Sequence, residues 1–140
     1  MRGWQDAMRE TGREPVFTVE GDWSSSSGEE AANQLLDAHP EIDAIFAAND
    51  QMALSVLLVA QRRKIRVPED LALIGFDDLA ESAYFFPPLT TMRHDQFALG
   101  AAGVRMLVEL IEAEREEKAI LRQATIIAPI LITRSTTQNC

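Results

Sequence analysis

Two short apolar runs, each ending in polar residues, constrain the fold of this chain more than any other feature. Residues 44–48 run directly into Asn49, and residues 71–76 run directly into Asp77. Short runs that are apolar throughout are typical of strands buried on both faces of a parallel sheet. Ligand sites in such sheets lie outside the carboxyl ends of the strands. The pattern therefore predicts a parallel sheet with a binding site at these polar residues.

Helical patterns alternate with the apolar runs. The first helix is expected to end at Gly12, the second at His39-Pro40 and the third at about Lys64. A β-rich run over 16–20 adds a further strand. The second helix can begin with a capping box, formed by Ser26 with Glu29 or by Ser27 with Glu30. This alternation predicts an α/β fold with a doubly wound parallel sheet.

The alternation of helical patterns and apolar runs changes after residue 76. Residues 77–89 are expected to form a loop, and Asp95 is expected to cap a long helix over about 96–116. A last strand is expected over 125–133, interrupted by Pro129, which suits an edge strand or a bulge.

Composition excludes several classes of protein. With 140 residues the chain suits one domain, and its 22 acidic and 13 basic residues give a net charge of −9. That charge argues against nucleic-acid binding by this chain. The basic cluster over 61–66 is either a helix C-terminus, which we favour, or a phosphate patch. No run approaches the ~20 apolar residues of a membrane span, and no signal peptide is visible, so we expect no membrane contact and a cytoplasmic protein.

Polar residues at the strand ends have the chemistry of a polyol site. Trp23 can cover the apolar face of a sugar ring, Asn49 can donate and accept at a hydroxyl, and Asp77 can accept from two hydroxyls. Structural roles remain open for each: Trp23 in the core, Asn49 as a helix N-cap and Asp77 as a cap or turn. On chemistry alone, His94 is a surface or core residue.

The helix over 50–64 has almost no polar side. A helix that is apolar all round must bury a second face, either in the core or against another subunit. A loop with Tyr84, Phe85 and Phe86 adds aromatic surface that is costly to leave in water. We favour a homodimer interface over core packing alone.

Enzymatic readings have little support. The chain has no glycine-rich phosphate loop and no nucleophile elbow. Two histidines and one terminal cysteine cannot form a usual zinc site. The adjacent Asp77 and Asp78 could bind a metal or act as acid and base, but neighbouring side chains usually point apart. We expect no catalysis, no cofactor and no metal.

Several blocks of sequence together resemble the lactose-repressor/galactose-repressor family of transcriptional regulators, most closely its lactose-repressor branch. Single blocks of this kind are weakly specific, but their order and spacing match from about residue 3 to residue 137. The blocks are residues 21–24, 48–54, 67–78 and 87–91.

The resemblance implies a two-lobed fold like that of the periplasmic sugar-binding proteins, with a sugar or sugar-like effector in the cleft. It places Trp23, Asn49 and Asp77 at effector-contact positions, and His94 where the family often has a polar cleft residue.

The same resemblance implies a homodimer whose surface includes Leu54, Tyr84 and Phe85. The function it implies is effector binding and dimerisation in a sugar-responsive repressor. The alternative is a transport-linked, periplasmic-type sugar-binding protein that works as a monomer.

The departures from the family pattern bear on domain organisation. The helix-turn-helix head, through which the family binds DNA, and most of the first lobe have no counterpart in these residues. The sequence therefore resembles a C-terminal portion that is expected to bind effector weakly or not at all and not to bind DNA. We expect residues 1–92 to belong to the second lobe, 93–122 to a helix of the first lobe, and 123–140 to a final strand and tail.

Overall fold

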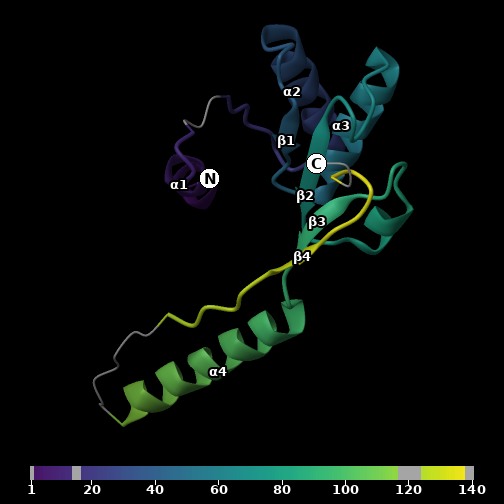
Figure 1. The fold of residues 1–140 in the computed structure, drawn as a ribbon. Helices are drawn as coiled ribbons and strands as arrows, with labels where there is room; N and C mark the ends of the chain where they lie inside the picture. Colours follow the sequence, from purple (N-terminus) through teal and green to yellow (C-terminus); the bar gives the residue numbers. More distant parts are fainter. Residues whose placement is uncertain (1, 14–16, 117–123, 138–140) are drawn as a thin grey trace.

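Four strands form one mixed sheet at the centre of the molecule (Figure 1). The computed structural model describes residues 2–13, 17–116 and 124–137. The strands lie side by side in the order β1, β2, β3 and β4; the first three are parallel, and β4 is antiparallel to β3. This confirms the expected α/β class. The strand bounds are β1 Ala44–Phe46, β2 Ala72–Phe76, β3 Thr90–Arg93 and β4 Ile130–Ile132.

The polar strand β3 was not expected. Thr90 and Thr91 are buried, because hydroxyl groups satisfy their polar atoms inside the sheet: the Thr136 hydroxyl accepts from the Thr90 N–H at 2.8 Å. Periodicity in apolar residues cannot detect such a strand.

Two expected strands differ from the structure. Residues 17–20 form no strand, and residue 16 lies outside the described residues. The last strand covers only Ile130–Ile132 and begins directly after Pro129, which has no N–H to donate to a ladder.

Helices precede and follow the strands, and most of their ends lie close to where the sequence placed them. The second helix is capped by Ser24, and not by Ser26 or Ser27 as expected: the Ser24 backbone is extended, and its side chain accepts from the Ser27 N–H. The helices are α1 Arg2–Glu10, α2 Ser25–Ala38, α3 Asp50–Arg63, a short 3-10 helix Ala80–Tyr84, and α4 Gln96–Arg115.

The core lies between α2, α3 and the sheet. Its largest fully buried side chains are Leu71, Leu73, Leu89 and Val59. Helix α2 approaches α3 closely at Gly28, where a Cβ would lie 2.8 Å from the Met52 Cα. The apolar side chains of α3 thus find their partners in both α2 and β2.

The expectation that residues 44–48 are buried on both faces was wrong. Strand β1 has only β2 as a neighbour among the described residues, and the Phe46 side chain is 45% exposed. An edge position explains this exposure, since nothing described covers the outer side of the strand.

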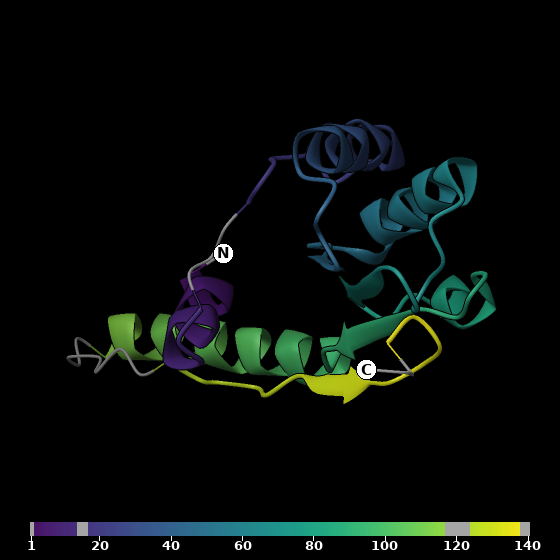
Figure 2. The ribbon, with the colours of Figure 1, turned by 45° about the horizontal axis from the view of Figure 1, so that its top comes forward.

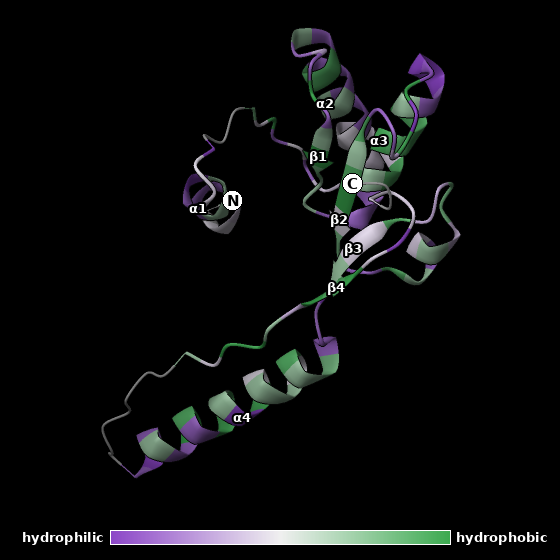
Figure 3. Ribbon diagram, in the orientation of Figure 1, coloured by the Kyte–Doolittle hydropathy of each residue, from purple (hydrophilic) through white to green (hydrophobic). Residues whose placement is uncertain are grey.

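Helix α4 projects away from the sheet (Figures 1 and 2). It has no buried residue, although apolar side chains lie around much of its circumference (Figure 3). Phe97 is 86% exposed and Val104 is 63% exposed. Across the described parts of the chain, no helix combines the length and apolarity needed to cross a membrane.

Candidate functional site

The candidate site lies where the parallel strands end. Asp77 follows β2 and His94 follows β3, and both line an open hollow of about 410 Å³. Trp23 and Asn49 do not line this hollow. Its other lining residues are Asp78, Arg93, Asp95, Gln96, Ala128 and Ile130.

Asp77 presents a carboxylate without a tight partner. Its Oδ1 atom lies 3.9 Å from the His94 Nδ1 atom, and within the described structure the carboxylate accepts no hydrogen bond. Burial raises the pKa of Asp77, with the His94 ring opposing this shift and the Asp50 charge adding to it. The carboxylate therefore has open acceptor positions for ligand hydroxyls.

His94 also has a polar side-chain atom without a hydrogen-bond partner in the described structure. The imidazole stacks on Phe76 with ring centroids 5.7 Å apart. Its Nδ1 atom is buried and has no hydrogen-bond partner among the described residues. Buried polar atoms are usually paired, so this nitrogen suits a polar ligand atom.

Trp23 and Asn49, the other two predicted site residues, are joined to each other. The Asn49 Nδ2 atom donates to the Trp23 carbonyl at 2.9 Å, and its Oδ1 atom accepts from the Met52 N–H at 2.8 Å. Asn49 is therefore the N-cap of α3 and also a tether for the preceding loop. Trp23 is 65% exposed, which excludes a core role for its indole in this structure.

The loop that carries Trp23 is fixed from its other side by Asp22. The Asp22 carboxylate accepts from the Ser24 N–H at 3.0 Å, and the Asp22 N–H donates to the Ser27 hydroxyl at 3.0 Å. Hydrogen bonds, above all from the Ser24 side chain, lower the pKa of Asp22 to about 2. The exposed indole thus sits on an anchored turn.

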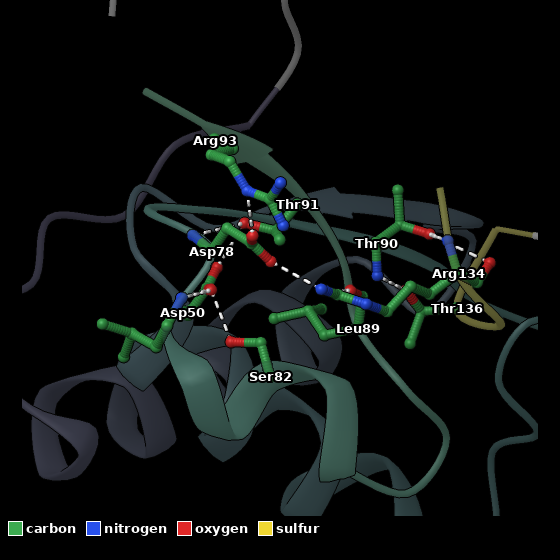
Figure 4. Close-up of polar contacts among 10 residues, drawn as sticks. Asp50, Asp78, Ser82, Leu89, Thr90, Thr91, Arg93, Arg134 and Thr136 are labelled. Atoms are coloured by element: carbon green, nitrogen blue, oxygen red, sulfur yellow. Dashed lines mark hydrogen bonds and ion pairs between the residues drawn. The ribbon is translucent and has the colours of Figure 1, made fainter. Parts of the chain in front are cut away.

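Asp78, the neighbour of Asp77, lies in a partly buried ion-pair network (Figure 4). Its carboxylate accepts from Arg93 Nε at 2.5 Å and from Arg134 Nη2 at 2.6 Å. Burial alone would raise the pKa of Asp78, but hydrogen bonds from Arg134 and Arg93 hold it below its ordinary value. Asp78 is thus occupied in joining β3 to the segment after β4.

Sequence reasoning missed two members of this region, Asp50 and Arg134. Asp50 is fully buried and joins α3 to residues after β2 and in β3. Arg134 is 56 positions from Asp78, so no local pattern could pair them. The only available signal was a charged residue directly after Asn49.

Among the described residues, no cluster of three or more histidines, cysteines or acids is arranged to hold a metal.

The residues expected at a dimer surface differ in exposure. Leu54 on α3 is 42% exposed, and Tyr84 is 87% exposed at the end of the 3-10 helix. Phe85 instead packs partly against the core, while its neighbour Phe86 is 95% exposed.

The basic residues near the end of α3 are paired with acids. Arg63 contacts Asp37 at 2.7 Å, and Arg62 contacts Glu29. Both arginines lie in the last turn of α3, as the helix-end interpretation expected.

The sequence pattern of the periplasmic binding protein-like domain matches residues 1–137. The chain belongs to this family. Its relatives within the family include transcriptional repressors. It is 36% identical over 121 residues to the repressor PurR of Pasteurella multocida, covering 85% of this chain and 36% of the relative. It is 39% identical over 113 residues to the lactose operon repressor of Klebsiella pneumoniae, covering 81% and 32%.

Solved structures of transcriptional regulators also match the fold of this chain. The CelR–cellobiose complex superposes with a TM-score of 0.87 at 31% identity, covering 96% of this chain and 41% of that one. A lac repressor dimer bound to operator and the anti-inducer ONPF gives 0.86 at 31% identity, covering 97% and 46%.

These matches confirm the resemblance to lactose/galactose-repressor regulators. PurR and lactose repressors match alike, so similarity does not single out the lactose branch. The chain spans about a third of the length of the curated relatives it matches.

Proposed function

We propose that this chain is the effector-binding and dimerisation part of a transcriptional repressor that responds to a sugar. The observation that carries the proposal is the Asp77 carboxylate 3.9 Å from the His94 Nδ1 atom, neither group having a hydrogen-bond partner among the described residues. Both residues line one hollow at the carboxyl edge of the parallel strands. Ligands bind at this edge in open α/β sheets. A structural relative at 31% identity is described as a cellobiose complex, which supports a sugar as effector.

Each expected site residue has a role in this proposal. The carboxylate of Asp77 accepts from two neighbouring hydroxyls, and His94 Nδ1 pairs with a third polar atom. The exposed indole of Trp23 covers an apolar face of the sugar ring. Asn49 contributes its remaining hydrogen-bonding capacity after capping α3 and holding the Trp23 carbonyl.

The proposal extends to assembly and location. A homodimer forms through Leu54, Tyr84 and Phe85, and the protein acts in the cytoplasm. DNA is contacted through a helix-turn-helix head that lies outside these 140 residues. The net charge of −9 on these residues disfavours contacts with DNA phosphates. Residues 1–92 form the second lobe, and α4 within 93–122 serves the first lobe, which agrees with its lack of buried residues here.

A fluorescence titration tests effector binding. The chain has two tryptophans, so a Trp4→Phe variant leaves Trp23 as the sole reporter. Millimolar mono- and disaccharides are titrated into this variant, and we expect saturable changes in emission with at least one sugar. Adding Asp77→Ala removes the change.

The matched control is Asp43→Ala, which removes an exposed carboxylate at the opposite, amino-terminal end of β1. It should leave the titration unaltered. If no sugar changes Trp23 emission, or if Asp77→Ala leaves the response intact, the proposed site is contradicted.

A further inference from the structure

Two residues of the proposed effector site, Trp23 and Asp77, have costly backbone conformations, and so does Asp78, the neighbour of Asp77. Trp23 has φ 73°, Asp77 has φ 114° and Asp78 has φ 54°. Side chains other than glycine rarely adopt positive φ, and such residues persist only where their surroundings hold them. Something in the structure must therefore hold the turn that follows β2.

Three successive N–H groups of this turn are each anchored. The Asp77 N–H donates to the Met92 carbonyl at 2.9 Å, which continues the ladder between β2 and β3. The Asp78 N–H donates to the Thr91 hydroxyl at 3.3 Å. The Leu79 N–H donates to Asp50 Oδ2 at 3.0 Å. The last two anchors do not belong to the sheet ladder.

Asp50 supports both of these anchors through its carboxylate. Its Oδ1 atom accepts from the Thr91 hydroxyl at 2.6 Å, which orients that hydroxyl to accept from Asp78 (Figure 4). Its Oδ2 atom accepts from Leu79 and from the Ser82 hydroxyl at 2.5 Å. Charge-assisted hydrogen bonds of this kind are stronger than neutral ones. Asp50 itself is fully buried, as are its bonds from Thr91 and Ser82, and its bond from the Leu79 N–H is partly buried.

The sheet makes room for the Asp50 carboxylate. A Cβ on Gly75 of β2 would lie 2.3 Å from Asp50 Oδ1 and 2.9 Å from Leu89 Cδ2. Glycine at this position lets a carboxylate at the start of α3 lie against β2. This close approach is more than a helix-dipole interaction requires, since an acid in a first turn can stay in solvent.

We propose that Asp50 is a positioning residue of the effector site, which sets the direction of the Asp77 side chain by holding the turn over 77–79 directly and through Thr91. This inference rests on the proposed function. Asn49, its neighbour, holds the Trp23 carbonyl. The two residues that begin α3 therefore hold the two loops that carry Trp23 and Asp77.

The test is nuclear magnetic resonance on the whole chain with Thr91→Val, which removes the relay hydroxyl and keeps the shape. The three-bond HN–Hα couplings of Asp77 and Asp78 report φ directly, and amide exchange reports the anchors. We expect altered couplings and about tenfold faster exchange at Asp78. Thr91→Ser, which retains the hydroxyl, should restore both.

The matched control is Thr136→Val. Thr136 is as buried as Thr91, and its hydroxyl also accepts a hydrogen bond from one backbone N–H. That N–H belongs to Thr90, which lies beside Thr91 on β3. It should leave residues 77–79 unchanged. Asp50→Asn should speed exchange at both Asp78 and Leu79; if that variant does not fold, Thr91→Val decides.

Unchanged couplings and exchange in Thr91→Val, or equal changes in Thr136→Val, would overturn the inference. Neither measurement uses a sugar, so a failed sugar titration contradicts the proposed function and leaves this result standing. Where wild-type chain does bind a sugar, Thr91→Val should weaken that affinity and Thr136→Val should not.

Discussion

At the scale of single residues, two adjacent carboxylates have opposite environments. Asp77 lines the hollow without a hydrogen-bonding partner among the described residues, and burial raises its pKa. Asp78 is held by two guanidinium groups that lower its pKa despite burial. Active and binding sites commonly contain such perturbed groups, and here only Asp77 retains free acceptor capacity.

Replacing Asp77 with asparagine should stabilise the chain at neutral pH. Its folded-state pKa lies above the ordinary value of 3.8, so the stability linked to it is present below 3.8 and lost as pH rises through the raised pKa. Asp77→Asn should therefore raise the melting temperature at pH 7, and the gain should vanish below about pH 3.8. Thermal unfolding across this pH range measures the effect, and a lower melting temperature at pH 7 would contradict it.

Asp78→Asn provides the contrast of opposite sign. Its pKa is lowered, so its contribution is present above 3.8 and lost as pH falls through the lowered pKa. Removing the charge that pairs with Arg134 and Arg93 should lower the unfolding free energy at pH 7, by less than for a fully buried pair because Arg93 is half-exposed. The same unfolding series measures both variants, and equal effects of the two would refute the difference in environment.

At the scale of elements, the beginning of α3 organises the site. Asn49 caps this helix and holds the Trp23 carbonyl, while Asp50 holds the turn after β2. The start of this helix thus supports both the loop that carries Trp23 and the turn that carries Asp77.

Two substitutions at Asn49 should separate its capping role from its tethering role. Asn49→Ala loses both and should reduce stability by about 1 kcal/mol, whereas Asn49→Ser keeps a capping oxygen and should lie within about 0.5 kcal/mol of wild type. Both lose the amide that donates to Trp23, so both should shift Trp23 emission in the Trp4→Phe background. Urea unfolding and fluorescence give the two readouts; unshifted emission in Asn49→Ser would contradict the tether.

Sequence alone predicted the elements whose signals are local. The helix over 50–64 was located from its cap and its apolar residues, and β2 from its apolar run. Strand β3 was missed because Thr90 and Thr91 are buried through hydrogen bonds to distant residues. Asp77 was predicted as a site candidate from its place after an apolar run, and His94 only through the family resemblance. The Asp50 and Arg134 contacts depend on tertiary structure and leave no local pattern.

At the scale of the whole molecule, large apolar side chains remain exposed on several of the described elements. Helix α4 has no buried residue, and Leu54 and Tyr84, two of the three residues proposed for the dimer surface, are exposed. Exposed apolar patches of this kind mark association surfaces.

The proposed surface with Leu54, Tyr84 and Phe85 should make the chain dimeric. Sedimentation velocity should show a concentration-dependent dimer, and Leu54→Glu should shift it toward monomer because the charge would be buried in the interface. Gln34→Glu adds a charge on an exposed position of α2 and should leave the dimer intact. A monomer at all concentrations would contradict the dimer surface and favour a transport-type binding protein.

Effector binding at the carboxyl edge of the sheet can be tested directly by finding where a sugar binds. The most direct measurement is mapping of amide and indole chemical shifts on the wild-type chain during titration with the sugar that changes Trp23 emission most. We expect shifts confined to the Trp23 indole, residues 77–79 and His94. Shifts centred elsewhere on the described structure, or none at saturating sugar, would contradict an effector site at the carboxyl edge of this sheet.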